Sequence, residues 1–86
     1  LIVGPCSLHD EEATLDYARR LHKVQKACSG QVLIVMRAYF EKPRTTLGWK
    51  GMLYDPHLDG SYDLDLGVRK SRKLLCEIAE IGVPCA

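Results

Sequence analysis

The sequence predicts an α/β fold with a parallel sheet. Two apolar runs, residues 1–3 and 32–36, each lead into a loop or turn and then into a segment with helical spacing. The second run is apolar without interruption, which is typical of a strand covered on both faces. A third strand is expected to begin at "VPCA", residues 83–86. The order strand, helix, strand, loop, helix, strand implies parallel strands joined by crossovers.

The first helix is expected to begin after Asp10, a residue type that caps helix N-termini. Glu11 and Glu12 place negative charge in the first turn, where the helix dipole favours it. Gly30 suits the left-handed turn that closes such a helix. His22 falls on the polar side and is expected to face solvent. The predicted apolar face follows a spacing of three or four residues and comprises Ala13, Tyr17, Leu21, Val24 and Cys28.

A second helix is expected between Asp63, as its N-cap, and Gly82, as its C-cap, because Pro84 prevents continuation. Its apolar side is predicted to comprise Leu64, Gly67, Ser71, Leu74 or Leu75, Ile78 and Ile81. Its basic residues are expected mostly to face water; they are Arg69, Lys70, Arg72 and Lys73.

Length indicates that these elements are part of a longer protein. The chain has 86 residues, begins with Leu1 inside an apolar run and is short for a domain. Two or three parallel strands cannot close a core alone. A (β/α)8 TIM barrel and an open doubly wound sheet both begin this way, but no GxGxxG follows the first strand, which favours the barrel. Residues 1–86 would then be an incomplete domain: the first two β/α units and the start of the third strand.

Composition restricts the partners and the compartment. The formal net charge of +1 gives no support for binding nucleic acid or an anionic membrane. No apolar run approaches the roughly 20 residues of a transmembrane helix. The four cysteines show no CxxC spacing, and reduced thiols are expected. Cys28 and Cys76 fall on predicted apolar helix positions. The parent protein is expected in the cytoplasm.

The segment "FEKPRTTLGWKG", residues 40–51, is the clearest candidate for a binding loop. It follows the second strand, and ligands of parallel α/β folds bind at the carboxyl ends of strands. With Arg37 at the strand end, its cations Lys42, Arg44 and Lys50 suit phosphate or carboxylate, and Thr45 and Thr46 add hydroxyl donors. The alternative is a solvated loop whose charges pair with Asp55, Asp59 and Asp63. The nearby rings of Tyr39, Phe40 and Trp49 are expected to pack within the loop rather than to stack on nucleic acid bases.

Cys6 follows the first strand and should lie at the same edge of the sheet as Arg37. A buried structural thiol, a nucleophile and a metal ligand are all open readings from the residues alone. His9 and His57 are possible partners for such a site, although ordinary helix-start and loop roles suit them better.

Three stretches together resemble a known family. "GPCSLHD" (residues 4–10), "MRAYFEKPRTTLGWKG" (36–51) and "DPHLDGSYDLDLGVRKSRKLL" (55–75) are similar to the class I 3-deoxy-D-arabino-heptulosonate 7-phosphate (DAHP) synthases. The resemblance implies condensation of phosphoenolpyruvate with erythrose 4-phosphate, the first step of the shikimate pathway. It also implies that this chain is about a quarter of such an enzyme, the N-terminal part of its barrel.

The resemblance implies roles for individual residues. Cys6 matches a ligand of an essential divalent metal of the Mn, Fe, Co or Zn type. Arg37 and Lys42 match catalytic residues that contact phosphoenolpyruvate. The triplet Arg44, Thr45 and Thr46 matches the motif that holds the phosphate of erythrose 4-phosphate. The family's other metal ligands would lie beyond Ala86, and a homo-oligomeric parent with feedback inhibition by an aromatic amino acid is expected.

Two alternatives stay open. The sister synthase that makes 3-deoxy-octulosonate 8-phosphate uses a barrel, phosphoenolpyruvate and a five-carbon aldose phosphate. Its loop resembles Ala-Asn-Arg-Ser-Ser where this chain has Pro43, Arg44, Thr45 and Thr46. A non-catalytic phosphate-binding or interaction module is the alternative from another class.

Overall fold

The computed structural model of the chain describes residues 1–42 and 47–86. Its elements alternate between strand and helix, as the sequence predicts. They are β1 (Ile2–Val3), α1 (Glu11–Ala27), β2 (Val35–Met36) and α2 (Leu64–Ile81).

β1 and β2 form a parallel pair, with Ile2 opposite Val35 and Val3 opposite Met36. A third segment begins to pair on the other side of β2, because Met36 and Cys85 form a parallel bridge. The Ala86 amide donates to the Met36 carbonyl at 2.9 Å. The predicted parallel order and the start of a third strand are therefore confirmed.

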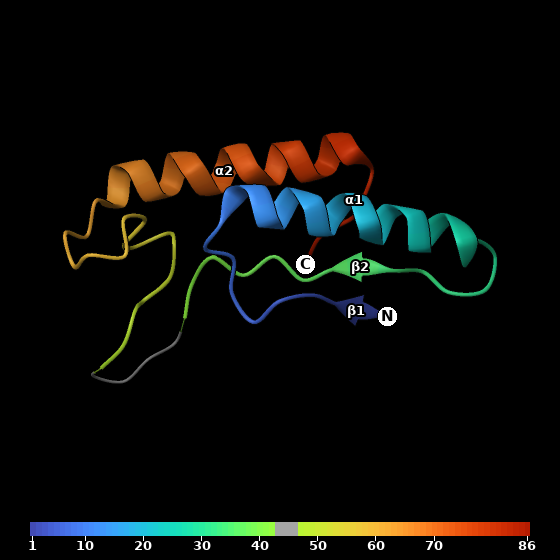
Figure 1. The fold of residues 1–86 in the computed structure, drawn as a ribbon, viewed down its shortest axis with the longest axis horizontal. Helices are drawn as coiled ribbons and strands as arrows, with labels where there is room; N and C mark the ends of the chain where they lie inside the picture. The colour runs from blue at the N-terminus through green and yellow to red at the C-terminus, as the bar shows by residue number, and fades with distance from the viewer. Residues whose placement is uncertain (43–46) are drawn as a thin grey trace.

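Both helices lie on the same side of the parallel strands (Figure 1). They also pack against each other. The apolar core fills the space between the helices, the strands and the loop that precedes α2. Its buried side chains are Leu8, Ala18, Leu21, Ile34, Met36, Met52, Leu74, Ile78 and Val83.

α1 begins where the sequence predicts. The Asp10 side chain accepts a hydrogen bond from the Ala13 amide at 2.8 Å, and its carbonyl accepts one from the Thr14 hydroxyl at 2.6 Å. This second bond satisfies a polar side chain inside the core, so Thr14 can be buried. The predicted face is wrong in part, because Ala13 and Val24 are exposed. The buried residues are Thr14, Ala18 and Leu21.

α2 follows its prediction more closely. The Asp63 side chain accepts from the Leu66 amide at 3.2 Å, and Gly82 adopts the left-handed conformation at the C-cap, with φ of 101°. Leu64 and Leu75 are exposed, so the buried face uses Leu74 rather than its neighbour. The buried residues of α2 are Gly67, Ser71, Leu74 and Ile78.

The apolar runs of the sequence are longer than the strands they form. The second strand was predicted over residues 32–36, yet Val32 and Leu33 lie before β2 and are exposed. Leu1, Leu33 and Ile2 expose 73%, 69% and 64% of their surface. The helices cover one side of the strands, and within residues 1–42 and 47–86 no other helix or strand covers the opposite side.

Two smaller predictions about side chains need correction. All four cysteines are free, as expected, but Cys76 is exposed. It follows Leu74 by two positions, roughly 200° around the helix from that buried residue. His22 was expected to face solvent, yet it is half-buried with its Nδ1 atom enclosed, because its ring lies against Gly82 at the end of α2.

Among the residues that the structure describes, neither helix is long and apolar enough to cross a membrane.

Candidate functional site

The carboxyl ends of β1 and β2 lie at one edge of the sheet, where the loops that follow both strands start (Figure 1). Cys6 lies in the loop after β1 and is exposed. Arg37 follows β2 directly, and its Nη2 donates to the Cys6 carbonyl oxygen at 3.3 Å. The prediction that Cys6 and Arg37 lie at the same edge is therefore confirmed.

The Arg37 guanidinium is oriented by a second contact. Its Cζ atom lies 4.0 Å from the centroid of the Tyr39 ring, which is the geometry of a cation–π interaction. Its Nε atom is enclosed and has no hydrogen-bond partner within residues 1–42 and 47–86. A buried donor without an acceptor is costly. Because this Nε atom is enclosed, an anion at Arg37 would have to contact the terminal guanidinium nitrogens.

Lys42 lies at the base of the cationic loop and is half-buried. Its amide donates to the Lys50 carbonyl at 2.8 Å, and the Leu53 amide donates to the Phe40 carbonyl at 3.1 Å. These two bonds define a stem, residues 40–42 with 50–53, which holds the two ends of the loop together. The backbone of Lys42 is therefore fixed relative to β2, on the side of the sheet edge that carries Arg37.

A glycine is required in this stem. Gly51 is buried and has a φ of 111°, in the left-handed region that side chains disfavour. A Cβ atom at this position would overlap the Phe40 carbonyl oxygen. The two segments of the stem approach each other so closely at Gly51 that no other residue type fits there.

The predicted phosphate-binding residues Arg44, Thr45 and Thr46 lie outside the described residues, as does Pro43. In the sequence they fall between Lys42 and Leu47.

Asp55 forms a buried turn that the sequence analysis did not predict, since it named this acid only as a possible partner of the loop cations. It is only 4% exposed, and its carboxylate accepts from the amides of Gly60 at 3.0 Å and Tyr62 at 3.4 Å. Its carbonyl accepts the indole N–H of Trp49 at 2.7 Å. The sequence signal that would have found it is an Asp followed by Pro56 and Gly60, since such acids close turns with their own side chains.

The three acids proposed as partners of the loop cations accept hydrogen bonds from backbone amides. Asp55 holds the turn just described, Asp59 accepts from the Ser61 amide at 3.0 Å and Asp63 caps α2. Hydrogen bonds from Ser61 hold the pKa of the Asp59 carboxyl below its usual value. Asp63 also lies 3.5 Å from Nε2 of His57.

The histidines do not complete a metal centre with Cys6. His57 is paired with Asp63, and His9 contacts the Trp49 ring. Among the described residues, no group of three or more His, Cys, Asp or Glu side chains could hold a metal ion. Cys6 could supply one soft ligand to a metal ion, because its thiol is exposed at the strand ends. Cys85 differs, since burial raises the pKa of its thiol.

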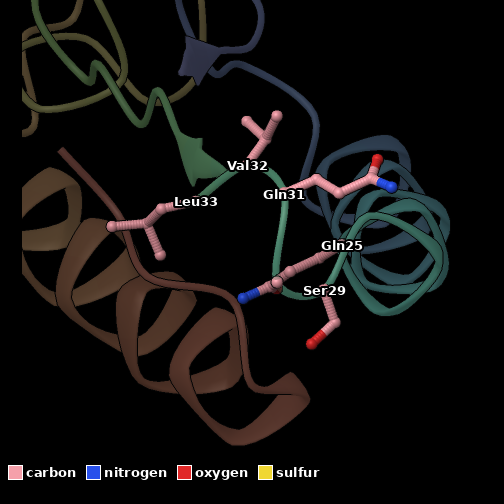
Figure 2. Close-up of a pocket in the computed structure, with 6 residues that line it drawn as sticks. Gln25, Ser29, Gln31, Val32 and Leu33 are labelled. Atoms are coloured by element: carbon pink, nitrogen blue, oxygen red, sulfur yellow. The ribbon is translucent and has the colours of Figure 1, made fainter.

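Two hollows flank the sheet at opposite ends. One of about 380 Å³ lies at the amino end of β2, lined by Gln25, Ser29 and residues 30–33 (Figure 2). It lies before β2, away from Arg37 and Cys6. The other, of about 720 Å³, lies between residues 38–41 and the face of α2 at Ser71 and Leu75. That hollow adjoins the candidate site but is mostly apolar.

The fold and the site define a class of protein: α/β proteins that carry a thiol and cations on the loops after neighbouring parallel strands. Within that class the chain belongs to the DAHP synthetase I family, whose family model matches residues 1–85.

Several relatives are similar over the whole chain. It is 51% identical over 86 residues to the Tyr-sensitive phospho-2-dehydro-3-deoxyheptonate aldolase of Escherichia coli, covering 100% of this chain and 24% of that protein. The Trp-sensitive enzyme of Enterobacter agglomerans is 52% identical, with 100% and 25% covered. The aldolase of Amycolatopsis methanolica is 54% identical over 84 residues, with 98% and 41% covered.

A solved structure agrees with the sequence comparison. Phospho-2-dehydro-3-deoxyheptonate aldolase from Francisella tularensis superposes with a TM-score of 0.93 at 49% identity, covering 98% of this chain and 25% of that chain. The chain thus spans about a quarter of the length of the first relatives that it matches.

Proposed function

We propose that the full-length protein condenses phosphoenolpyruvate with D-erythrose 4-phosphate and water, giving DAHP and phosphate. This reaction makes it a transferase that catalyses the first step of the shikimate pathway. The observation that carries the proposal is the meeting of Cys6 and Arg37 at one sheet edge, next to the stem that bears Lys42. Identity of 49–54% to phospho-2-dehydro-3-deoxyheptonate aldolases supports it.

Residues 1–86 are proposed as the first two β/α units and the start of the third strand of a (β/α)8 barrel, part of its catalytic domain. The parallel pairing, the bridge at Cys85 and the placement of both helices on one side support this architecture. In such a barrel the remaining strands would cover the apolar side chains that Leu1 and Leu33 expose. The candidate site would then lie at the face where barrel enzymes bind substrates.

The proposed roles follow from charge. Phosphoenolpyruvate carries a carboxylate and a phosphate, and erythrose 4-phosphate carries a second phosphate, so the two substrates repel each other. Arg37 and Lys42 would bind phosphoenolpyruvate, and Arg44 with the hydroxyls of Thr45 and Thr46 would bind the aldose phosphate. Holding both anions on fixed cations lowers the entropic cost of bringing the reacting carbons together. The enol carbon then bonds to the aldehyde carbon, water adds at the neighbouring carbon, and phosphate leaves as its C–O bond breaks.

Cys6 would hold a divalent metal of the Mn, Fe, Co or Zn type as one ligand, with the other ligands supplied from outside residues 1–86. When bound, the metal supplies Lewis-acid polarisation of the aldehyde oxygen. The Arg37 hydrogen bond to the Cys6 carbonyl fixes the backbone at this ligand, so the thiolate and the phosphoenolpyruvate site share one support.

The regulatory proposal rests on the relatives. We propose that an aromatic amino acid inhibits the full-length protein, because the relatives named above include Tyr-sensitive and Trp-sensitive enzymes. A homo-oligomer in the cytoplasm is proposed from the family resemblance alone.

Product formation by the full-length protein tests the reaction. Phosphoenolpyruvate is supplied with either erythrose 4-phosphate or a five-carbon aldose phosphate, and phosphate release and the keto-acid product are measured. Equal amounts of DAHP and phosphate from the four-carbon substrate are expected. Turnover with the five-carbon substrate alone would identify the octulosonate synthase instead. Phosphate binding without turnover of either pair would identify a non-catalytic module.

A further inference from the structure

Trp49 connects the loops that follow the two strands. Its ring centroid lies 6.2 Å from that of His9, with the rings at 83° in an edge-to-face contact. On its other side the indole N–H donates to the Asp55 carbonyl at 2.7 Å. His9 belongs to the loop that carries Cys6, and Trp49 precedes Lys50, which accepts the Lys42 amide. One side chain thus touches the loop after β1 and fixes the stem after β2.

The acceptor of Trp49 is itself held firmly. The Asp55 amide donates to the Gly51 carbonyl at 2.9 Å, and the Asp55 carboxylate accepts from the turn at Gly60. The carbonyl that receives the indole N–H therefore lies on a closed turn. Because its acceptor lies on a closed turn, this hydrogen bond restrains the Trp49 side chain. A hydrogen bond to an acceptor on a mobile loop would not restrain it.

The loop after β1 is fixed to the same region by its backbone. The Leu8 amide donates to the Tyr39 carbonyl at 2.8 Å, and Leu8 is buried in the core. Leu8 and His9 are neighbours, so His9 presents its ring to Trp49 from an anchored segment. The backbone bond at Leu8 and the ring contact at Trp49 thus join the two loops, in addition to the hydrogen bond from Arg37 to the Cys6 carbonyl.

We propose that Trp49 is a positioning residue, which sets the Lys42 stem relative to the Cys6 loop through its ring and its N–H. This inference rests on the proposed function, because it assigns Lys42 and Cys6 to two parts of one reaction centre. A shift of about 1 Å between such parts costs on the order of a hundredfold in rate, so a rigid connection between them has a catalytic use.

A purely structural tryptophan would behave differently. Its loss would reduce the fraction of folded enzyme, which lowers the apparent kcat and leaves KM unchanged. A misplaced stem would change how the correctly folded enzyme holds its substrates, and KM would rise.

The test uses Trp49→Phe in the full-length enzyme, since Phe keeps an apolar ring and removes the N–H donor. The KM for phosphoenolpyruvate is expected to rise about tenfold, because the stem carries Lys42, which is proposed to bind that substrate. Tyr54→Phe is the matched control: Tyr54 is an exposed ring in the same segment, and both KM values should stay unchanged.

Variants of His9 test the ring contact. His9→Ala should raise the same KM, and His9→Phe should restore it, because a benzene ring can make the same edge-to-face contact. The double variant Trp49→Leu with His9→Ala should be no worse than Trp49→Leu alone. Independent, additive losses would overturn the connection between the two loops.

Hydrogen exchange separates this inference from the proposed function. In Trp49→Phe, the amides of Leu8 and Lys42 should exchange faster together, whether or not the enzyme turns over these substrates. If wild-type protein has no turnover, the proposed function fails, and exchange alone decides the coupling. If wild-type protein is active but both KM values and both amides are unaffected, Trp49 does not position the site and the proposed function stands.

Discussion

Gly4 lies directly against the backbone of Arg37. A Cβ atom on Gly4 would lie 2.8 Å from the Arg37 carbonyl oxygen and 2.9 Å from the Arg37 Cβ atom. Real Cβ atoms do not approach other atoms so closely, so the ends of β1 and β2 meet at a point that admits only glycine. This contact precedes Cys6 by two residues and thus sets where the Cys6 loop leaves the sheet.

Gly4→Ala should therefore displace Arg37 as well as destabilise the protein. We expect a loss of about 1–3 kcal/mol in the free energy of unfolding, from overpacking, and a higher KM for phosphoenolpyruvate. Urea unfolding and steady-state kinetics of the full-length protein measure both. Gly30→Ala is the comparison, because Gly30 has open space around it and a φ of 84°. It should lose stability through backbone strain alone and keep its KM. A normal KM in Gly4→Ala would show that Arg37 does not depend on this contact.

Cys6 and Cys76 are both exposed, and they provide a matched pair for testing metal ligation. In the full-length protein, Mn²⁺ should slow the alkylation of Cys6 by iodoacetamide, because a coordinated thiolate is not free to react, and should leave Cys76 unaffected. Peptide mass spectrometry measures each rate. Cys6→Ser should lose metal content and activity with little change in stability, since a hydroxyl is a poor substitute for a soft thiolate. Equal protection of both cysteines, or normal metal content in Cys6→Ser, would argue against the ligand role.

The buried carboxylate of Asp55 gives a prediction about stability. In Asp55→Asn the side chain keeps one acceptor oxygen for the amides of Gly60 and Tyr62, and its NH₂ group faces donors. A loss of about 1–3 kcal/mol in the free energy of unfolding is expected from the unsatisfied groups. Asp16→Asn is the control, because Asp16 is exposed and pairs with Arg20, so its change should cost no more than about 0.5 kcal/mol. If both variants lost a similar free energy of unfolding, the hydrogen bonds to the Asp55 carboxylate would not stabilise the protein more than an exposed ion pair does.

Residues 1–86 expressed alone should be inactive and should unfold without a cooperative transition. Leu1, Ile2 and Leu33 are largely exposed, and no group of three or more His, Cys, Asp or Glu side chains among the described residues could hold a metal ion. The outer edge of β1 is unpaired among the described strands, so association through it is expected. Urea unfolding, light scattering and product formation test this directly. A cooperative transition with measurable turnover would contradict it.

Helix ends could be predicted from the sequence because each depends on a local signal. Asp10 and Asp63 cap the two helices with their own side chains, and Gly82 takes the left-handed conformation that its type favours. These contacts involve residues close together in the chain. They form largely regardless of what packs on the helix later.

The faces that these elements bury depended on contacts that spacing does not reveal. The predicted face of α1 included Val24, but the structure buries Thr14, whose hydroxyl is satisfied by the Asp10 carbonyl. Val32 and Leu33 were expected in a covered strand, but no element of the described part of the chain covers them. Apolar spacing predicts which residues seek burial, not which partner is present to provide it.

The sequence allowed the position of site residues to be predicted where that position depends on the end of a strand. Topology alone placed Cys6 and Arg37 at one edge, and their hydrogen bond confirms that placement. The contact between Trp49 and the Asp55 carbonyl was missed, because it depends on how the loop folds back rather than on any spacing in the sequence. The roles of Arg37, Lys42 and Arg44 toward particular substrates stay predictions.

The most direct test of the central claim is the effect of Arg37→Ala and Arg44→Ala on the KM of each substrate in the full-length enzyme. Arg44→Ala should raise the KM for erythrose 4-phosphate far more than that for phosphoenolpyruvate. The loss of one charge-assisted contact should weaken binding of erythrose 4-phosphate by about 2–3 kcal/mol. Arg37→Ala should show the opposite preference. If each variant raised both KM values equally, the claim that Arg37 binds phosphoenolpyruvate and Arg44 binds erythrose 4-phosphate would be contradicted.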